Sequence, residues 1–246
     1  MMSFSQSTIR LTQACPLKCL GCPLWESSKS AARDPIFDSI LDHQQWSSFF
    51  MSTGVLNIIG GDPLLVPELT HFLTKLKQQL LHTRLYLWTS AQSGIDAIKA
   101  VFPWIDVFVI YIPSSIEEDY ALHTGEDGLT SLKRTFSACK KSRIPFVLNH
   151  PIRPSTVWQL PDIHLLAKEY GVPLWIHYDP LDHFFDDSIA YINRYRGVEG
   201  VLVFKRHTPP PSFCQAFPYG GIDHPLQLVN LLFRESFNGI RKRLGL

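Results

Sequence analysis

The sequence predicts an α/β protein built on a mostly parallel sheet, and two patterns indicate this. Apolar runs of strand length alternate with segments whose apolar residues recur at helical spacing along most of the 246 residues. Glycine or proline ends several of the runs, as Gly60 ends the apolar stretch 55–59. Strands that alternate with helices favour parallel pairing, with the helices outside the sheet.

Six strands are predicted in order along the chain, with a helix after each of the first five. The strands are expected at residues 7–12, 55–59, 83–89, 106–112, 145–148 and 173–178. The helices are expected at residues 38–52, 66–81, 93–102, 130–142 and 160–170, the last ended by Gly171. Because six units fall short of the eight that close a barrel, we expect an open, partial (βα)6 TIM-like barrel.

The regular alternation stops after residue 178. A helix at 184–195, a strand at 200–205, a proline-rich loop at 208–219 and a closing helix at 226–244 are predicted there. We therefore expect two parts: a barrel over residues 1–180, and a C-terminal extension over residues 181–246 that packs on the barrel or caps it.

The charge and hydropathy of the chain limit its class of partner. Lys and Arg total 23 against 22 Asp and Glu, which gives no support for nucleic-acid binding driven by bulk charge. The first residues lack the apolar core of a signal peptide, and no apolar run is long enough for a membrane span. We therefore expect a cytoplasmic protein with no membrane partner.

Three of the five cysteines lie within eight residues, with the spacing C-x3-C-x2-C: Cys15, Cys19 and Cys22. An odd number of cysteines in this arrangement does not indicate a disulfide framework. Three thiolates so close in sequence can surround one compact inorganic centre, and iron–sulfur clusters favour thiolate ligands, usually four. Three ligands leave one iron open for a small chelating molecule. Gly21 lets the backbone of this loop approach a ligand.

Three other interpretations of the cysteine loop remain open at this point. The three thiols plus Cys214 or a histidine would suit a zinc site. With Cys214 as fourth ligand, they would suit a closed cluster that serves electron transfer. Alternatively, they are buried free cysteines.

A second motif, Gly60-Gly61-Asp62-Pro63, follows the second predicted strand. Two glycines at the end of a strand let the backbone lie against a ligand. The Asp62 carboxylate is a good acceptor for an ammonium group, and Pro63 stiffens the turn. An ordinary tight turn before a helix is the alternative.

Together the two motifs resemble the signature of the radical SAM superfamily. In that family, three cysteines after the first strand hold a [4Fe–4S] cluster, and a Gly-Gly-Glu-Pro motif contacts the methionine amino group of S-adenosylmethionine. Here Asp62 stands in place of the glutamate. The resemblance implies that Cys15, Cys19 and Cys22 ligate the cluster and that residues 60–63 bind S-adenosylmethionine.

The resemblance also implies an activity. The reduced cluster of a radical SAM enzyme cleaves S-adenosylmethionine to a 5′-deoxyadenosyl radical, which abstracts hydrogen from a substrate. We expect a flavodoxin or a ferredoxin-type protein as reductant, and a peptide, protein or small metabolite as substrate. No reaction subclass and no catalytic side chain can be named. The alternative is a non-catalytic scaffold protein with a degenerate barrel that binds zinc or an iron–sulfur cluster.

Several other residues are candidates from their places at predicted strand ends. Family members often carry an aromatic residue before the third cysteine, where this chain has Gly21, so only the Gly21 backbone is expected to contact the cofactor. Ser90, Asn149 and His177 follow the third, fifth and sixth strands, where they would face S-adenosylmethionine or substrate. Their alternative roles are turn capping for Ser90 and Asn149 and ordinary hydrogen bonding for His177.

Three further residues are assigned ordinary roles. His150 is expected on the face opposite to Asn149, because successive strand residues point to opposite faces. Cys139 lies in a predicted helix and is expected to be a small buried hydrophobe. Cys214 is expected to be a loop thiol.

Overall fold

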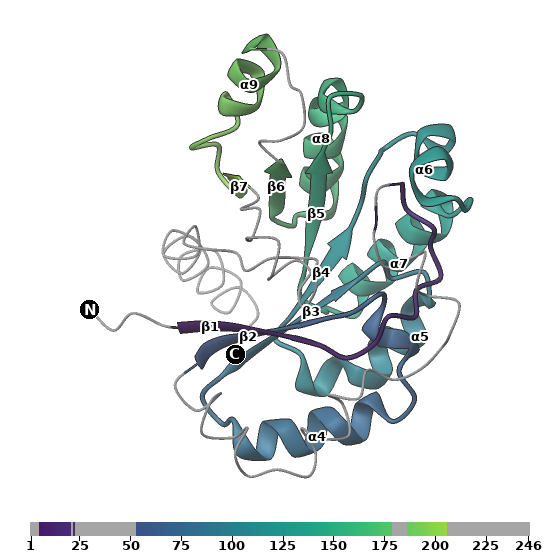
Figure 1. Cartoon of the computed structure of the whole chain (residues 1–246), viewed down its shortest axis with the longest axis vertical. Coiled ribbons are helices and arrows are strands. Elements are labelled where there is room, and N and C mark those ends of the chain that lie inside the picture. The colour runs from purple at the N-terminus through teal and green to yellow at the C-terminus, as the bar shows by residue number, and fades with distance from the viewer. Residues whose placement is uncertain (1–4, 21, 23–52, 179–185, 206–246) are drawn as a thin grey trace. The chain divides into compact units, whose positions relative to one another are not determined.

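The computed structural model describes residues 5–20, 22, 53–178 and 186–205 (Figure 1). Seven strands form one sheet whose spatial order, β1-β2-β3-β4-β5-β6-β7, follows the order along the chain. The pairs β1–β2, β2–β3, β3–β4 and β6–β7 are parallel. The predicted α/β class with a parallel, partial-barrel type of sheet is therefore confirmed, with seven strands in the sheet.

The strands lie close to their predicted positions. They are β1 Ser5–Arg10, β2 Thr53–Ile59, β3 Arg84–Thr89, β4 Val107–Tyr111, β5 Phe146–Ile152, β6 Leu174–Tyr178 and β7 Val201–Lys205. β5 continues past the predicted end at residue 148, so His150 belongs to the strand. β7, predicted within the C-terminal extension, pairs with β6.

Helices follow most of the strands in the described part of the chain. They are α4 Leu69–Gln79, α5 Gly94–Val101, α6 Glu117–Thr124, α7 Leu129–Lys141, α8 Leu160–Tyr170 and α9 Asp186–Asn193. Short 3-10 turns lie at Pro63–Leu65, Phe102–Trp104 and Val157–Gln159. Gly171 ends α8 in the left-handed conformation, as its sequence position predicts.

The chain divides into two compact units, Met1–Leu148 and Asn149–Leu246. In the first unit, β1 to β4 carry α4, α5 and α7, and fully buried side chains fill the space between strands and helices, among them Leu56, Ile58, Leu87 and Phe108. In the second unit, α8 and α9 accompany β6 and β7. The division predicted at residue 180 stays a prediction.

The helix predicted over residues 66–81 begins three residues later than expected. Pro63–Leu65 forms a separate 3-10 turn, and Val66 is extended at φ −71°, ψ 117°. The cause is Pro67, because the ring of a proline disfavours helical backbone at the residue before it. α4 then starts at Leu69, after Glu68 in the left-handed conformation.

Helix α6 is not predicted by the sequence analysis, which places no helix between the strand at 106–112 and the helix at 130–142. Three acidic residues in its first turn suit the positive end of the helix dipole, and Gly125 ends the helix at φ 72°. The Glu117 carboxylate accepts hydrogen bonds from the backbone amides of Gly128, Leu129 and Thr130 at the start of α7. Although burial opposes the effect, these bonds hold the pKa of Glu117 below its usual value.

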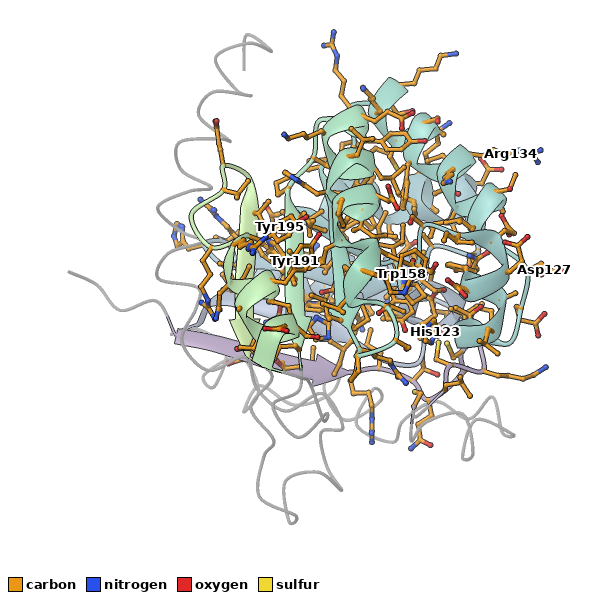
Figure 2. All side chains as sticks on the ribbon, turned by 90° about the horizontal axis from the view of Figure 1, so that it is seen from above. His123, Asp127, Arg134, Trp158, Tyr191 and Tyr195 are labelled. Atoms are coloured by element: carbon orange, nitrogen blue, oxygen red, sulfur yellow. The ribbon has the colours of Figure 1, made fainter. Side chains whose placement is uncertain are left out.

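Three aromatic rings pack together in the second unit. The Tyr195 ring makes edge contacts with His164 of α8 and with Tyr191 of α9, at centroid distances of 5.6 and 5.9 Å (Figure 2). These two ring contacts hold the turn that follows α9 against α8. In the described part of the chain, no helix combines the length and apolarity that crossing a bilayer requires.

Four of the predictions above concern residues outside the described ranges. They are the helices at 38–52 and 226–244, the loop at 208–219 with Cys214, and the position of Gly21.

Candidate functional site

The cysteine loop, which we define as residues 11–22, begins as a continuation of the β1–β2 ladder. The Leu11 amide donates to the Ile59 carbonyl at 2.9 Å. Beyond the end of β2, the Gly61 amide donates to the Thr12 carbonyl at 2.8 Å, and the Asp62 amide donates to the Ala14 carbonyl at 2.7 Å. The backbone leading to Cys15 is therefore held directly against the Gly60-Gly61-Asp62-Pro63 turn.

The two glycines allow this close approach. A Cβ atom on Gly61 would lie 2.2 Å from the carbonyl oxygen of Ala14, and one on Gly60 would lie 2.9 Å from that of Thr12. Real Cβ atoms do not approach backbone oxygen this closely. In the structure these glycines lie against the backbone of the cysteine loop. The predicted approach of a ligand to the same glycines stays a prediction.

Helix α6 holds the second half of the cysteine loop. The Lys18 amide donates to the Thr124 carbonyl at 2.7 Å, and the Leu20 amide donates to the His123 carbonyl at 2.8 Å. These carbonyls belong to the last turn of α6, where backbone carbonyls have no donor within the helix. Figure 1 shows the loop running from β1 to α6, and Figure 2 places His123 at this end of the helix.

The three cysteines of the loop are partly buried, and their thiols lie close enough to interact electrostatically. Burial raises the pKa of the Cys15 thiol to about 12, and negative charge on Asp62, Cys19 and Cys22 raises it further, against the lowering effect of a backbone hydrogen bond from Leu17. Without a metal, Cys15 is therefore a thiol at neutral pH. Metal binding at this site releases its proton.

A zinc site and an iron–sulfur cluster require different arrangements of the ligand side chains. In the described ranges, no three His, Cys, Asp or Glu side chains converge closely enough to hold a single metal ion. A tetrahedral zinc site needs such convergence, with each sulfur about 2.3 Å from one point. In a cubane cluster each thiolate binds a different iron, so the thiols stand further apart. Cys15, Cys19 and Cys22 can supply three of the four thiolates that such a cluster usually takes; their role as ligands stays a prediction.

Asp62 is fully buried at the centre of the turn, where its carboxylate joins β2 to β3. It accepts hydrogen bonds from the Leu64 amide, from the Thr89 hydroxyl, and from both the amide and the hydroxyl of Ser90. Burial raises the pKa of Asp62, and the hydrogen bonds from Ser90, Thr89 and Leu64 oppose this effect. The shorter acid thus ties two strand ends together; a contact with a cofactor stays a prediction.

Replacing Asp62 with alanine is expected to lower the free energy of unfolding by about 3 kcal/mol, because buried donors on Leu64, Thr89 and Ser90 lose their acceptor. Urea unfolding of the metal-free protein measures the change. Thr74→Ala is the matched control, since that hydroxyl bonds an exposed helix carbonyl and its loss should cost less than about 1 kcal/mol. Equal stability of Asp62→Ala and wild type would show that the Asp62 carboxylate does not stabilise the connection between β2 and β3.

The other candidates at strand ends fall into two groups. Ser90 donates its hydroxyl to Asp62 and accepts from the Gln92 amide at 3.4 Å, so its side chain belongs to the β2–β3 connection. In the second unit, the structure brings Asn149 and His177 together, with 3.1 Å between Asn149 Oδ1 and His177 Nδ1. Because an amide oxygen only accepts, Nδ1 carries the proton in this pair and Nε2 is the basic nitrogen. Cofactor binding by these residues stays a prediction.

The structure also gives the positions of Cys139 and His150, for which no part in cofactor binding is predicted. Cys139 is fully buried in α7, as predicted, and burial raises the pKa of its thiol to about 11. His150 is also fully buried.

No protein-family model matches the chain, and no curated protein matches it. Solved structures do. SuiB from Streptococcus suis, bound to its precursor peptide SuiA, superimposes with a TM-score of 0.64 at 12% identity over 88% of this chain and 51% of SuiB. SuiB bound to S-adenosylmethionine gives 0.61 at 12% identity, over 88% of this chain and 50% of SuiB. anSMEcpe with bound AdoMet and the Cp18Cys peptide gives 0.54 at 17% identity, over 71% of this chain and 50% of anSMEcpe.

The chain has the fold of SuiB and anSMEcpe. Both are structures in which that fold is seen with S-adenosylmethionine bound. The chain spans about half the length of these proteins.

Proposed function

We propose that this chain is a radical SAM enzyme. The observation that carries the proposal is the junction of the two motifs: the cysteine loop and the Gly60–Gly61 turn share two backbone hydrogen bonds at the ends of β1 and β2. The fold supports the proposal, because it is shared with structures that hold S-adenosylmethionine. The C-x3-C-x2-C spacing of the three cysteines in the sequence also supports the proposal.

In this proposal, Cys15, Cys19 and Cys22 bind a [4Fe–4S] cluster through three thiolates and leave one iron for the amino and carboxylate groups of S-adenosylmethionine. The Asp62 carboxylate is engaged by its neighbours, so the contact with the methionine amino group falls to the backbone carbonyls of Gly60 and Gly61. Gly21 adds a backbone contact, and Ser90 and Asn149 contribute polar groups from other strand ends.

The chemistry that the bound cofactors supply is the one-electron cleavage of S-adenosylmethionine to a 5′-deoxyadenosyl radical that takes a hydrogen atom from substrate. The chain binds and orients the cofactors and excludes water from them. A flavodoxin or ferredoxin-type protein provides the electron, and the cytoplasm supplies the reducing compartment that this requires.

A peptide is the substrate class that we propose. SuiB is seen with a precursor peptide and anSMEcpe with the Cp18Cys peptide, and both share this fold. An open sheet of parallel strands leaves its carboxyl edge accessible to an extended chain. A small metabolite is the alternative outcome of a substrate screen.

Anaerobic reconstitution with iron and sulfide, followed by dithionite reduction and addition of S-adenosylmethionine, tests the proposed function. We expect about four irons per chain, absorption near 400 nm and formation of 5′-deoxyadenosine. A colourless protein that binds one zinc ion instead would contradict the proposal and support a non-catalytic scaffold. A protein that holds four irons without cleaving S-adenosylmethionine would support a scaffold that binds an iron–sulfur cluster.

A further inference from the structure

Tyr120 of α6 is a fully buried tyrosine beside the cysteine loop. It lies one helical turn before the residues that accept hydrogen bonds from the loop, and the Thr124 hydroxyl donates to its carbonyl at 2.8 Å. Thr124 in turn accepts the Lys18 amide. The backbone that carries Tyr120 is thus fixed to the loop that carries the cysteines.

Gln92 determines the hydrogen-bonding role of the Tyr120 hydroxyl. The Gln92 side-chain nitrogen donates to the Tyr120 oxygen at 2.6 Å and to the Gly128 carbonyl at 3.3 Å, which uses both of its hydrogens. The phenol oxygen is therefore an acceptor toward Gln92. Its own hydrogen is left to point at another group.

The charged groups that affect the pKa of Tyr120 indicate which group this is. Burial raises the pKa of the Tyr120 phenol, and negative charge on Cys19, Glu117 and Cys15 raises it further, against a hydrogen bond from Gln92. Glu117 already accepts bonds at the start of α7. Within the described ranges, no acceptor is found for the Tyr120 hydroxyl hydrogen, and a buried hydroxyl that donates to nothing is costly. Of the charged groups that affect the phenol, Cys19 and Cys15 remain as acceptors for this hydrogen.

We propose that Tyr120, oriented by Gln92, donates a hydrogen bond to a sulfur atom of the metal centre held by Cys15 and Cys19 and thereby raises its reduction potential. The inference rests on the proposed function. Hydrogen bonds to cluster sulfur stabilise the reduced form, because that form carries more negative charge. Tyr120 is thus a positioning and tuning residue supplied by α6, outside both sequence motifs.

Tyr120→Phe removes the hydroxyl and keeps the ring. One hydrogen bond to a charged sulfur corresponds to about a tenfold change in the reduction equilibrium, or about 59 mV for one electron. We expect the midpoint potential of the reconstituted cluster, measured by anaerobic titration followed by electron paramagnetic resonance, to become more negative by about that amount. Iron and sulfide content should remain at the wild-type value.

Two further variants make the test specific. Tyr86→Phe also removes a buried tyrosine hydroxyl, but Tyr86 lies on β3, where burial and the neighbouring Arg84 determine its environment, so the midpoint should not change. Gln92→Met removes the donor that orients Tyr120 and should give a smaller shift in the same direction. It replaces Tyr120→Phe as the test should that variant not fold.

The outcomes separate this inference from the proposed function. A wild-type protein that holds the cluster and a Tyr120→Phe variant with an unchanged midpoint would overturn the inference alone. A wild-type protein that retains no iron and sulfide would overturn both. Equal shifts in Tyr120→Phe and Tyr86→Phe would assign the effect to general destabilisation and also overturn the inference.

Discussion

Cys19→Ala is expected to abolish both iron retention and S-adenosylmethionine cleavage. Cys19 is the middle one of the three proposed ligands, and the Cys22 amide donates to its carbonyl at 3.0 Å, so both later cysteines share one turn. With two thiolates left, the cluster loses a strong covalent anchor, and we expect at least a 100-fold fall in the rate of 5′-deoxyadenosine formation. Iron and sulfide assays and product chromatography of the reconstituted variant measure the two effects.

Cys139→Ala is the matched control for this experiment. Cys139 lies outside the cysteine loop and is buried within α7. Its replacement should cost about 1 kcal/mol of stability and leave iron content and cleavage at wild-type values. If Cys19→Ala kept the iron while Cys139→Ala lost it, the assignment of the cluster to the loop would be wrong.

Gly61→Ala is expected to disrupt the site without removing any ligand. The added Cβ would lie 2.2 Å from the Ala14 oxygen, 2.5 Å from the Ala14 carbon and 2.6 Å from the Gln13 oxygen, all of them backbone atoms that cannot rotate away. The cysteine loop must therefore move off the β2 turn, at a cost of about 3 kcal/mol. We expect this loss in urea unfolding of the metal-free protein and a loss of most iron after reconstitution.

Gly94→Ala controls for the general effect of replacing a glycine. A Cβ on Gly94 meets nothing within 4 Å, but its backbone is left-handed at φ 80°. The variant should lose about 1 kcal/mol of stability and retain its iron. Full iron retention in Gly61→Ala would show that the loop is not held by this turn.

The strands could be predicted because each is a short apolar run with a clear end. β2 stops at two glycines, and β3 and β4 lie between polar or proline-containing segments. The cysteine motif and the glycine pair were visible for the same reason, since each is local in sequence. Their junction also follows from parallel strands, whose carboxyl ends share one edge of the sheet.

The contacts that cross between elements could not be predicted in this way. The bond between Asp62 and Ser90 depends on the register of β2 against β3, which pairs Ile58 with Leu87. α6 escaped detection because Tyr120, Ala121 and Leu122 are consecutive and do not define one apolar face. The first-turn acids and Gly125 were the signals that could have found it. The role of Tyr120 required the position of Gln92, 28 residues away in sequence.

The cysteine loop is joined by backbone hydrogen bonds to Gly61 and Asp62 on one side and to His123 and Thr124 on the other. These bonds have a consequence for assembly of the metal site. These hydrogen bonds order the loop without any metal. The conformational entropy cost of ordering these residues, about 1–2 kcal/mol each, is therefore part of the free energy of folding and not of metal binding. A preorganised binding site binds its ligand more tightly, because no binding free energy is lost in ordering the site. If the proposed cluster is bound, its loss by oxidation should therefore leave a folded apoprotein that can bind a new cluster.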